Sequence, residues 1–130
     1  MKYKKLGNSD LIVSNICLGC MGFGDSAKGQ HSWTLNEENS EEIIKYALEK
    51  GINFFDTAIA YQSGTSEQYL GRILKKYIER EKVVIATKFL PRTEDEIEKG
   101  ISGQQHIETM LNKSLENLGM EYVDLYIYHM

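Results

Sequence analysis

The sequence has no long apolar stretch and no concentration of basic residues. Its longest apolar runs, VVIA and VDLYIY, are far too short to cross a bilayer, and the basic start MKYKK is not followed by a signal-type apolar segment. The formal net charge is −4, and Lys and Arg occur only in short pairs, so no electrostatic surface for nucleic acid or anionic membrane is present. These absences predict a cytoplasmic protein that acts on small molecules.

Cysteine is also scarce, and the two present, Cys17 and Cys20, raise the question of a redox pair or of zinc ligands. On a strand over residues 15–19, positions three apart lie about 10 Å from each other on opposite faces, beyond the roughly 7 Å Cα separation that a disulfide spans. No second CxxC motif follows, and His31 and His106 lack ligand spacing. We therefore expect reduced structural thiols and no metal.

Short apolar runs alternate with longer amphipathic ones along the chain. The pattern predicts a hairpin over 2–14, strands over 15–19, 52–56, 82–89 and 122–129, and helices over 34–50, 66–79 and 104–118. Thr34 and Glu37 have the spacing of a capping box, and Gly51 is expected to stop the same helix. Residues 92–102 are expected to form a polar surface loop. The expected buried face of the last helix consists of Ile107, Leu111, Leu115 and Leu118.

The predicted fold class is α/β, with helices and strands alternating as in a (β/α)8 barrel. The strands begin roughly 31 to 39 residues apart, close to the roughly 30-residue βα unit of a barrel that typically has about 250 residues. We therefore expect an N-terminal half-barrel of about four βα units with an opening hairpin. A Rossmann-like sheet is the alternative, but GCMGFG at residues 19–24 has the wrong glycine spacing for it. These glycines allow close approach of a ligand to the backbone, or form a plain flexible loop.

Each of three apolar strands ends in an ionisable residue. Because alternate residues of a strand share a face, Asp56, Lys88 and His129 are predicted to lie on one side of consecutive strands and at the same level, with Tyr61 in the loop above Asp56. Each residue alone has an ordinary structural role: a capping acid, a packed aromatic, a lysine reaching from a strand end, a terminal histidine. Together, unpaired on a buried face, they would be costly, so we predict a catalytic cluster at the barrel mouth.

Four segments of the sequence resemble those of a known family. NICLGCMGFG, GINFFDTAIAYQSGTSEQYLGRIL, VVIATKF and LENLGMEYVDLYIYH are similar, in order and spacing, to the N-terminal half of an aldo-keto reductase, and the resemblance covers essentially the whole chain. It implies a (β/α)8 barrel that reduces aldehydes or ketones to alcohols with NADPH. The family's catalytic Asp, Tyr, Lys and His correspond to Asp56, Tyr61, Lys88 and His129.

The resemblance also implies where small molecules bind. The residues expected to contact NADPH are Gly19, Cys20, Met21 and Asp56. The residues expected to bound a small carbonyl substrate are Trp33, Tyr61 and His129. Trp33 belongs to an HSW segment that looks like the long first loop of bacterial members, and a surface-packed aromatic is its alternative role.

The expected roles follow from what hydride transfer needs. Negative charge builds on the carbonyl oxygen and is met by a proton from Tyr61, a step typically worth about 10²- to 10⁴-fold. A tyrosine titrates near pH 10, and a cation such as Lys88 favours its phenolate and makes it a better acid. Asp56 is expected to keep Lys88 charged and aimed, and neutral His129 to hydrogen-bond the carbonyl oxygen.

The sequence stops one residue after His129, so we expect strands five to eight, which hold most of the family's cofactor contacts, to be missing. The chain is then the front piece of a reductase with little activity alone, or an oxidoreductase completed by a C-terminal half-barrel partner or by self-association through open strand edges. A non-catalytic binding or interaction module on the same scaffold is the third hypothesis. The intact set of four catalytic residues argues against it.

Overall fold

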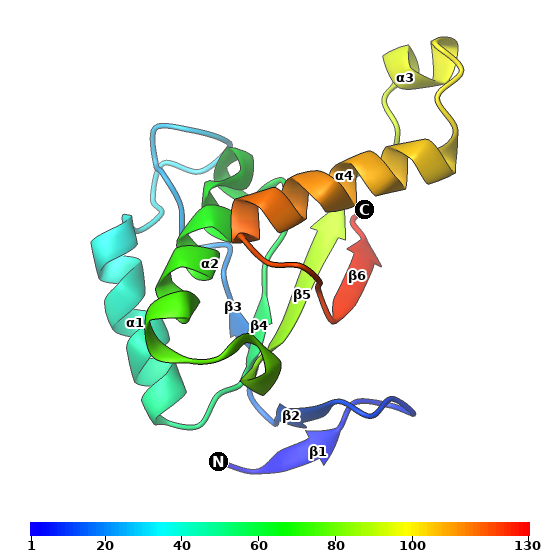
Figure 1. Cartoon of the computed structure of the whole chain (residues 1–130). Helices are drawn as coiled ribbons and strands as arrows, with labels where there is room; N and C mark the ends of the chain where they lie inside the picture. Colours follow the sequence, from blue (N-terminus) through cyan, green and yellow to red (C-terminus); the bar gives the residue numbers. More distant parts are fainter.

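The computed structural model describes residues 1–130 and shows a parallel sheet with its long helices on one face (Figure 1). The sheet has four strands in the order β3-β4-β5-β6, and a separate antiparallel hairpin, β1-β2, lies near the end where these strands begin. The strands are β1 Tyr3–Lys5, β2 Ile12–Ser14, β3 Leu18–Gly19, β4 Phe54–Asp56, β5 Val84–Phe89 and β6 Leu125–Tyr128. The longer helices are α1 Glu37–Glu49, α2 Thr65–Tyr77 and α4 Gly103–Leu118. The hairpin, the four strands and the three helices are those predicted from the sequence.

The register of the sheet differs from the prediction in one respect. The expected face is correct, because Asp56 pairs with Ala86 and Lys88 pairs with Ile127, which keeps alternate residues on one side. The strand ends are not level, however: Lys88 lies two residues beyond the partner of Asp56, and His129 two residues beyond the partner of Lys88. Each strand is thus shifted along its neighbour, as strands tilted in a barrel must be. Long side chains then bridge the steps between strand ends.

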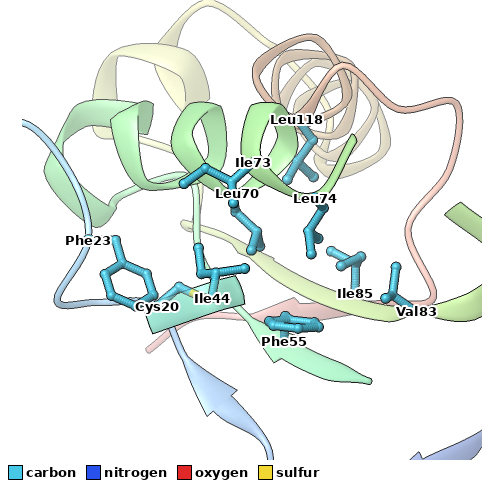
Figure 2. Packing of buried hydrophobic residues seen from close by; sticks show 10 residues of the cluster. All are labelled: Cys20, Phe23, Ile44, Phe55, Leu70, Ile73, Leu74, Val83, Ile85 and Leu118. Carbon is cyan, nitrogen blue, oxygen red and sulfur yellow. The ribbon is translucent and has the colours of Figure 1, made fainter. Parts of the chain in front are cut away.

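The hydrophobic core lies between the sheet and the helices. Figure 2 shows side chains of α2 and α4 pointing toward those of the strands, with Phe23 and Cys20 of the first loop closing one side. Phe55 and Ile85 occupy the helix-facing side of β4 and β5 and are completely buried. The core cluster consists of Cys20, Phe23, Ile44, Phe55, Leu70, Ile73, Leu74, Val83, Ile85 and Leu118. Burying a side chain of this size contributes roughly 1.5–3 kcal/mol.

The start of α1 corrects the predicted capping box. The N-cap is Asn36, whose side-chain oxygen accepts a hydrogen bond from the backbone N–H of Asn39 at 2.9 Å. Thr34 lies before the helix, and its hydroxyl donates to the carbonyl of Gly24. The Thr34 hydroxyl therefore holds two loop segments together, and Asn36, two residues later, caps the helix instead. Gly51 follows the helix with φ 88°, as expected of a residue that stops it.

The stretch between β5 and α4 is more ordered than the predicted loop. It contains a short helix, α3 Glu94–Glu98, started by a full capping box between Thr93 and Glu96. The predicted buried face of α4 is also partly wrong, because Ile107 is exposed while His106 is buried. The imidazole of His106 binds Glu96 and the carbonyl of Leu90 at 2.6 and 2.5 Å, which ties α3 to α4. Apolar spacing alone could not reveal this polar contact.

The first sheet strand is shorter than predicted, so Cys17, which was expected within it, precedes the strand, and Cys20 follows it. Both are free thiols; Cys17 is exposed and Cys20 is buried in the core. β3 and β6 form the two edges of the sheet, as expected. None of the helices combines the length and the apolar character that a bilayer span requires.

Candidate active site

The ammonium group of Lys88 is the centre of the predicted cluster. It donates to Oδ2 of Asp56 at 2.9 Å, to the backbone carbonyl of Thr57 at 2.8 Å and to the hydroxyl of Tyr61 at 3.1 Å. These three acceptors match the three hydrogens of the ammonium group. Asp56 and Lys88 come from the carboxyl ends of β4 and β5, and Tyr61 begins the short helix η1 Tyr61–Gly64. The structure thus brings three of the four predicted residues into direct contact.

These contacts keep Lys88 positively charged. Burial lowers the pKa of Lys88, but its hydrogen bonds to Asp56 and Tyr61 raise it by more, so the pKa lies above its ordinary value. The lysine side chain is only 13% exposed, whereas Asp56 is 33% exposed on the open side of the cluster. The cation therefore lies where it can stabilise negative charge that develops on the Tyr61 oxygen during a reaction.

His129, the fourth predicted residue, lies against the ring of Tyr61. The two ring centroids are 5.8 Å apart and the planes are perpendicular, an edge-to-face aromatic contact. The backbone N–H of His129 donates to the carbonyl of Phe89, which extends the pairing of β5 and β6 beyond the last strand residue. Nδ1 of His129 is buried and has no hydrogen-bond partner. Of the two ring nitrogens, Nε2 is therefore the one left to meet a ligand.

Buried hydroxyls hold the loop after β4 in place. The N–H of Thr57 donates to the carbonyl of Ala86, and its hydroxyl lies 2.9 Å from that of Ser66 in the first turn of α2. Ser66 in turn donates to the carbonyl of Cys20, so Thr57 is the donor in the hydroxyl pair. This chain of hydrogen bonds joins the residues that directly follow β3 and β4 to the first turn of α2. Sequence reasoning missed it, because Thr57 precedes Tyr61, Ser66 follows it and Cys20 lies in an earlier loop.

A buried carboxylate supports the same region from the helix side. Glu67 is completely buried and accepts hydrogen bonds from the hydroxyl of Thr87 at 2.6 Å and from the amide of Asn117 at 3.0 Å. Thr87 directly precedes Lys88, so this network fixes the strand at the residue where the ammonium group starts. Its only sequence signal was an acid in the first turn of a predicted helix, which helix dipoles explain equally well.

The residues predicted to bind small molecules differ in how accessible they are to a ligand. Gly19 pairs with Asp56 across β3 and β4, and a Cβ placed on it would meet nothing within 4 Å, so there is free space beside the cluster. Met21 is exposed. The side chain of Cys20 lies in the core, its backbone N–H donates to the carbonyl of Asp56, and its carbonyl accepts from the hydroxyl of Ser66. Its polar groups are therefore already hydrogen-bonded within the protein. Trp33 is exposed and stacks at a tilt on His31.

The cavities of this structure do not include the side chains of the cluster. One of about 350 Å³ lies between the ends of α2 and α4, near Arg80, Met120 and Tyr122, where the strands begin. Asp56, Tyr61, Lys88 and His129 line none of the cavities. They form an open surface at the carboxyl ends of the strands. That edge is where parallel α/β folds place their ligands.

Comparison with known proteins shows what this chain is similar to. The sequence model described as the Aldo/keto reductase family matches residues 15–130. Versiconal hemiacetal acetate reductase of Aspergillus parasiticus is 52% identical over 89 residues, which cover 68% of this chain and 25% of that protein. Probable aldo-keto reductase 1 of Glycine max is 37% identical over 126 residues, 96% of this chain and 35% of its own length.

Solved structures show the same likeness in three dimensions. The holo form of the aldo-keto reductase AKR11C1 from Bacillus halodurans superimposes with a TM-score of 0.77 at 35% identity, over 99% of this chain and 40% of that one. The neighbours are (β/α)8 barrels, and the four-stranded sheet described here corresponds to part of such a barrel. The chain therefore spans less than half the length of the relatives that it matches.

Proposed function

Because this chain belongs to the aldo/keto reductase family, we propose that it carries the proton-donating half of an NADPH-dependent carbonyl reductase, with Asp56, Tyr61, Lys88 and His129 as catalytic residues. Family membership establishes an oxidoreductase lineage. The observation that carries the proposal further is the Lys88 ammonium group, which contacts both the Asp56 carboxylate and the Tyr61 hydroxyl. A structural lysine at a strand end needs only the first of these contacts.

The proposed chemistry assigns one task to each side chain. NADPH, when bound, supplies a hydride to the carbonyl carbon of an aldehyde or ketone. As charge develops on the carbonyl oxygen, the Tyr61 hydroxyl gives it a proton, and the adjacent Lys88 stabilises the phenolate that remains. Asp56 holds Lys88 in place. Nε2 of His129, whose ring packs edge-on against Tyr61, donates to the same carbonyl oxygen and orients the substrate.

The free space beside the cluster fits the cofactor. Gly19 pairs with Asp56, and the space that a side chain at this position would fill is empty. Met21, two residues later in the loop, is exposed. We assign the near end of the cofactor to Gly19, Met21 and Asp56. Cys20 contributes at most its backbone, since its thiol lies in the core.

The rest of the cofactor site has to come from elsewhere in a complete barrel. β3 and β6 are open edges, and Tyr128 and Ile127 of β6 are exposed. We therefore propose that residues 1–130 are the N-terminal half of a barrel, and that full activity needs a C-terminal half-barrel, whether on the same polypeptide or on a partner, or a second copy paired along these edges. A non-catalytic module remains the alternative function.

The test combines binding, mass and turnover. The purified chain is titrated with NADPH while nucleotide fluorescence and light scattering are followed, and oxidation of NADPH is measured with 4-nitrobenzaldehyde as substrate. We expect saturable binding in a defined assembly and a loss of turnover of about 10²-fold or more in Tyr61→Phe. Tyr46→Phe, on the exposed surface of α1, is the matched control and should behave as wild type.

Two results would contradict the proposal. Turnover that survives in Tyr61→Phe would show that another group donates the proton. A folded chain that neither binds NADPH nor reduces the aldehyde, even when a C-terminal half-barrel of the family is supplied with it, would favour the binding-module alternative.

A further inference from the structure

The loop between β3 and α1 is fastened to one buried side chain, that of Gln62. Its amide nitrogen lies 2.8 Å from the carbonyl oxygen of Asp25, 2.5 Å from that of Lys28 and 2.6 Å from that of His31. Its amide oxygen accepts from the backbone N–H of His31 at 2.9 Å. Gln62 is only 1% exposed. The amide nitrogen has two hydrogens, which three carbonyl oxygens share, so one side chain contacts backbone groups at both ends and in the middle of residues 25–31.

The backbone of both segments is shaped for this contact. Gln62 has φ 48° and Ser63 has φ 54°, the left-handed region that costs a side-chain-bearing residue free energy. On the loop side, Gly24 and Gly29 also have positive φ, and a Cβ on either would lie 2.6 Å from an atom of Gln62. The loop backbone therefore packs directly onto Gln62. A strained residue enclosed by two required glycines indicates a contact that the rest of the structure holds in place.

This anchor connects two parts of the site. Gln62 directly follows Tyr61 in the sequence, whereas His31, at the far end of the anchored loop, packs against Trp33 with ring centroids 4.8 Å apart. Trp33 in turn lies over Gly22 of the GCMGFG loop, at 3.7 Å from where a Cβ would be. The position of the aromatic pair relative to the Tyr61 hydroxyl is thus set through the Gln62 side chain.

We propose that Gln62 is a positioning residue that holds residues 25–31 against the Tyr61 segment and so places the His31–Trp33 pair at the side of the active site. That this pair faces the substrate rests on the proposed function. The anchoring itself requires neither cofactor nor substrate, so it can be tested apart from catalysis.

The test uses Gln62→Gly, with Ser63→Gly as the matched control. Both substitutions relieve a left-handed residue, so neither should weaken the backbone, but only Gln62→Gly removes the amide that holds the loop; the side chain of Ser63 is exposed and makes no hydrogen bond. The readouts are trypsin cleavage after Lys28, which lies in the anchored loop, cleavage after Lys113 in α4 as the internal reference, and emission from Trp33, the single tryptophan.

In Gln62→Gly we expect cleavage after Lys28 to accelerate at least about tenfold, as loss of one or two net hydrogen bonds allows, while cleavage after Lys113 stays unchanged. Trp33 emission should shift, and the melting temperature should stay within a few degrees of wild type. Ser63→Gly should match wild type in all readouts. A purely structural role would instead raise cleavage at both lysines together.

The proposal is overturned if Gln62→Gly and Ser63→Gly release Lys28 equally or not at all. Should Gln62→Gly fail to fold, Gln62→Glu provides the second test. It keeps the size of the side chain but places a carboxylate against three carbonyl oxygens, and is expected to free Lys28 in the same selective way. Failure of both variants to fold also overturns the proposal, because Gln62 would then serve the whole fold rather than the loop.

Discussion

A methyl group added at Gly71 should destabilise the protein although it improves the helix. Gly71 lies in α2 where this helix crosses α4, and a Cβ placed on it would lie 2.0 Å from the carbonyl oxygen of Leu118 and 2.6 Å from the carbonyl carbon. Both are backbone atoms, so no side chain can rotate away. Alanine gains about 1 kcal/mol over glycine within a helix. Forcing extra volume into a well-packed contact, here between two helices, typically costs about 1–3 kcal/mol.

Because the overlap at 2.0 Å is with backbone atoms, we expect a cost in the upper half of that range. After the helix gain, Gly71→Ala should lose roughly 1–2 kcal/mol, and the melting temperature should fall by roughly 3–5 °C per kcal/mol. The control is Gly103→Ala at the start of α4, where a Cβ meets nothing within 4 Å, and which should be neutral or slightly stabilising. Urea unfolding followed by circular dichroism measures both. A Gly71→Ala variant at least as stable as wild type would refute the close contact of α2 with α4.

Three further predictions concern single groups. Cys17 is exposed as a residue, but partial desolvation of its thiol, with help from the Asp56 carboxylate, raises its pKa to about 11. Alkylation by iodoacetamide should therefore speed up about tenfold per pH unit up to that value, and Asp56→Asn should be alkylated faster than wild type at pH 8. The hydrogen bond from Arg72 lowers the pKa of Glu37, so the stability that this pair contributes is present above pH 4.5 and is lost as the pH falls below it. In Arg72→Gln, the free energy of unfolding measured in urea should therefore change less between pH 6 and pH 3 than in wild type. The difference should be no more than about 1 kcal/mol, because the pair is exposed. Asn36→Ala should cost about 1 kcal/mol in the same assay, whereas an unchanged value would contradict its capping role.

The parts of the fold that were predictable follow from short-range periodicity. Alternation along β4, β5 and β6 was enough to place Asp56, Lys88 and His129 on one face, and the register confirms that placement. Helix ends marked by a single strong residue, such as Gly51, were also predictable. These features depend on a few neighbouring residues, which the sequence displays directly.

The features that escaped prediction depend on partners far along the chain. Stagger between strands is a property of pairs, so alternation within each strand could not reveal it. Thr34 looked like a cap, but its hydroxyl binds Gly24 ten residues earlier. Gln62 appeared as one polar residue in a polar stretch, while its amide binds carbonyls more than thirty residues away. In such cases the sequence shows which residue can donate a hydrogen bond but not which distant backbone group accepts it.

The four proposed catalytic residues are not held equally firmly, and this has a consequence for the reaction. Lys88 has three hydrogen-bond acceptors, and its strand is fixed again through Thr87 and the buried Glu67. His129 follows the edge strand β6, held by one backbone hydrogen bond and one ring contact, with Nδ1 unpartnered. The proton-donating pair of Tyr61 and Lys88 is thus set within this chain. The orientation of His129, and with it that of the substrate carbonyl, will depend on whatever pairs with β6.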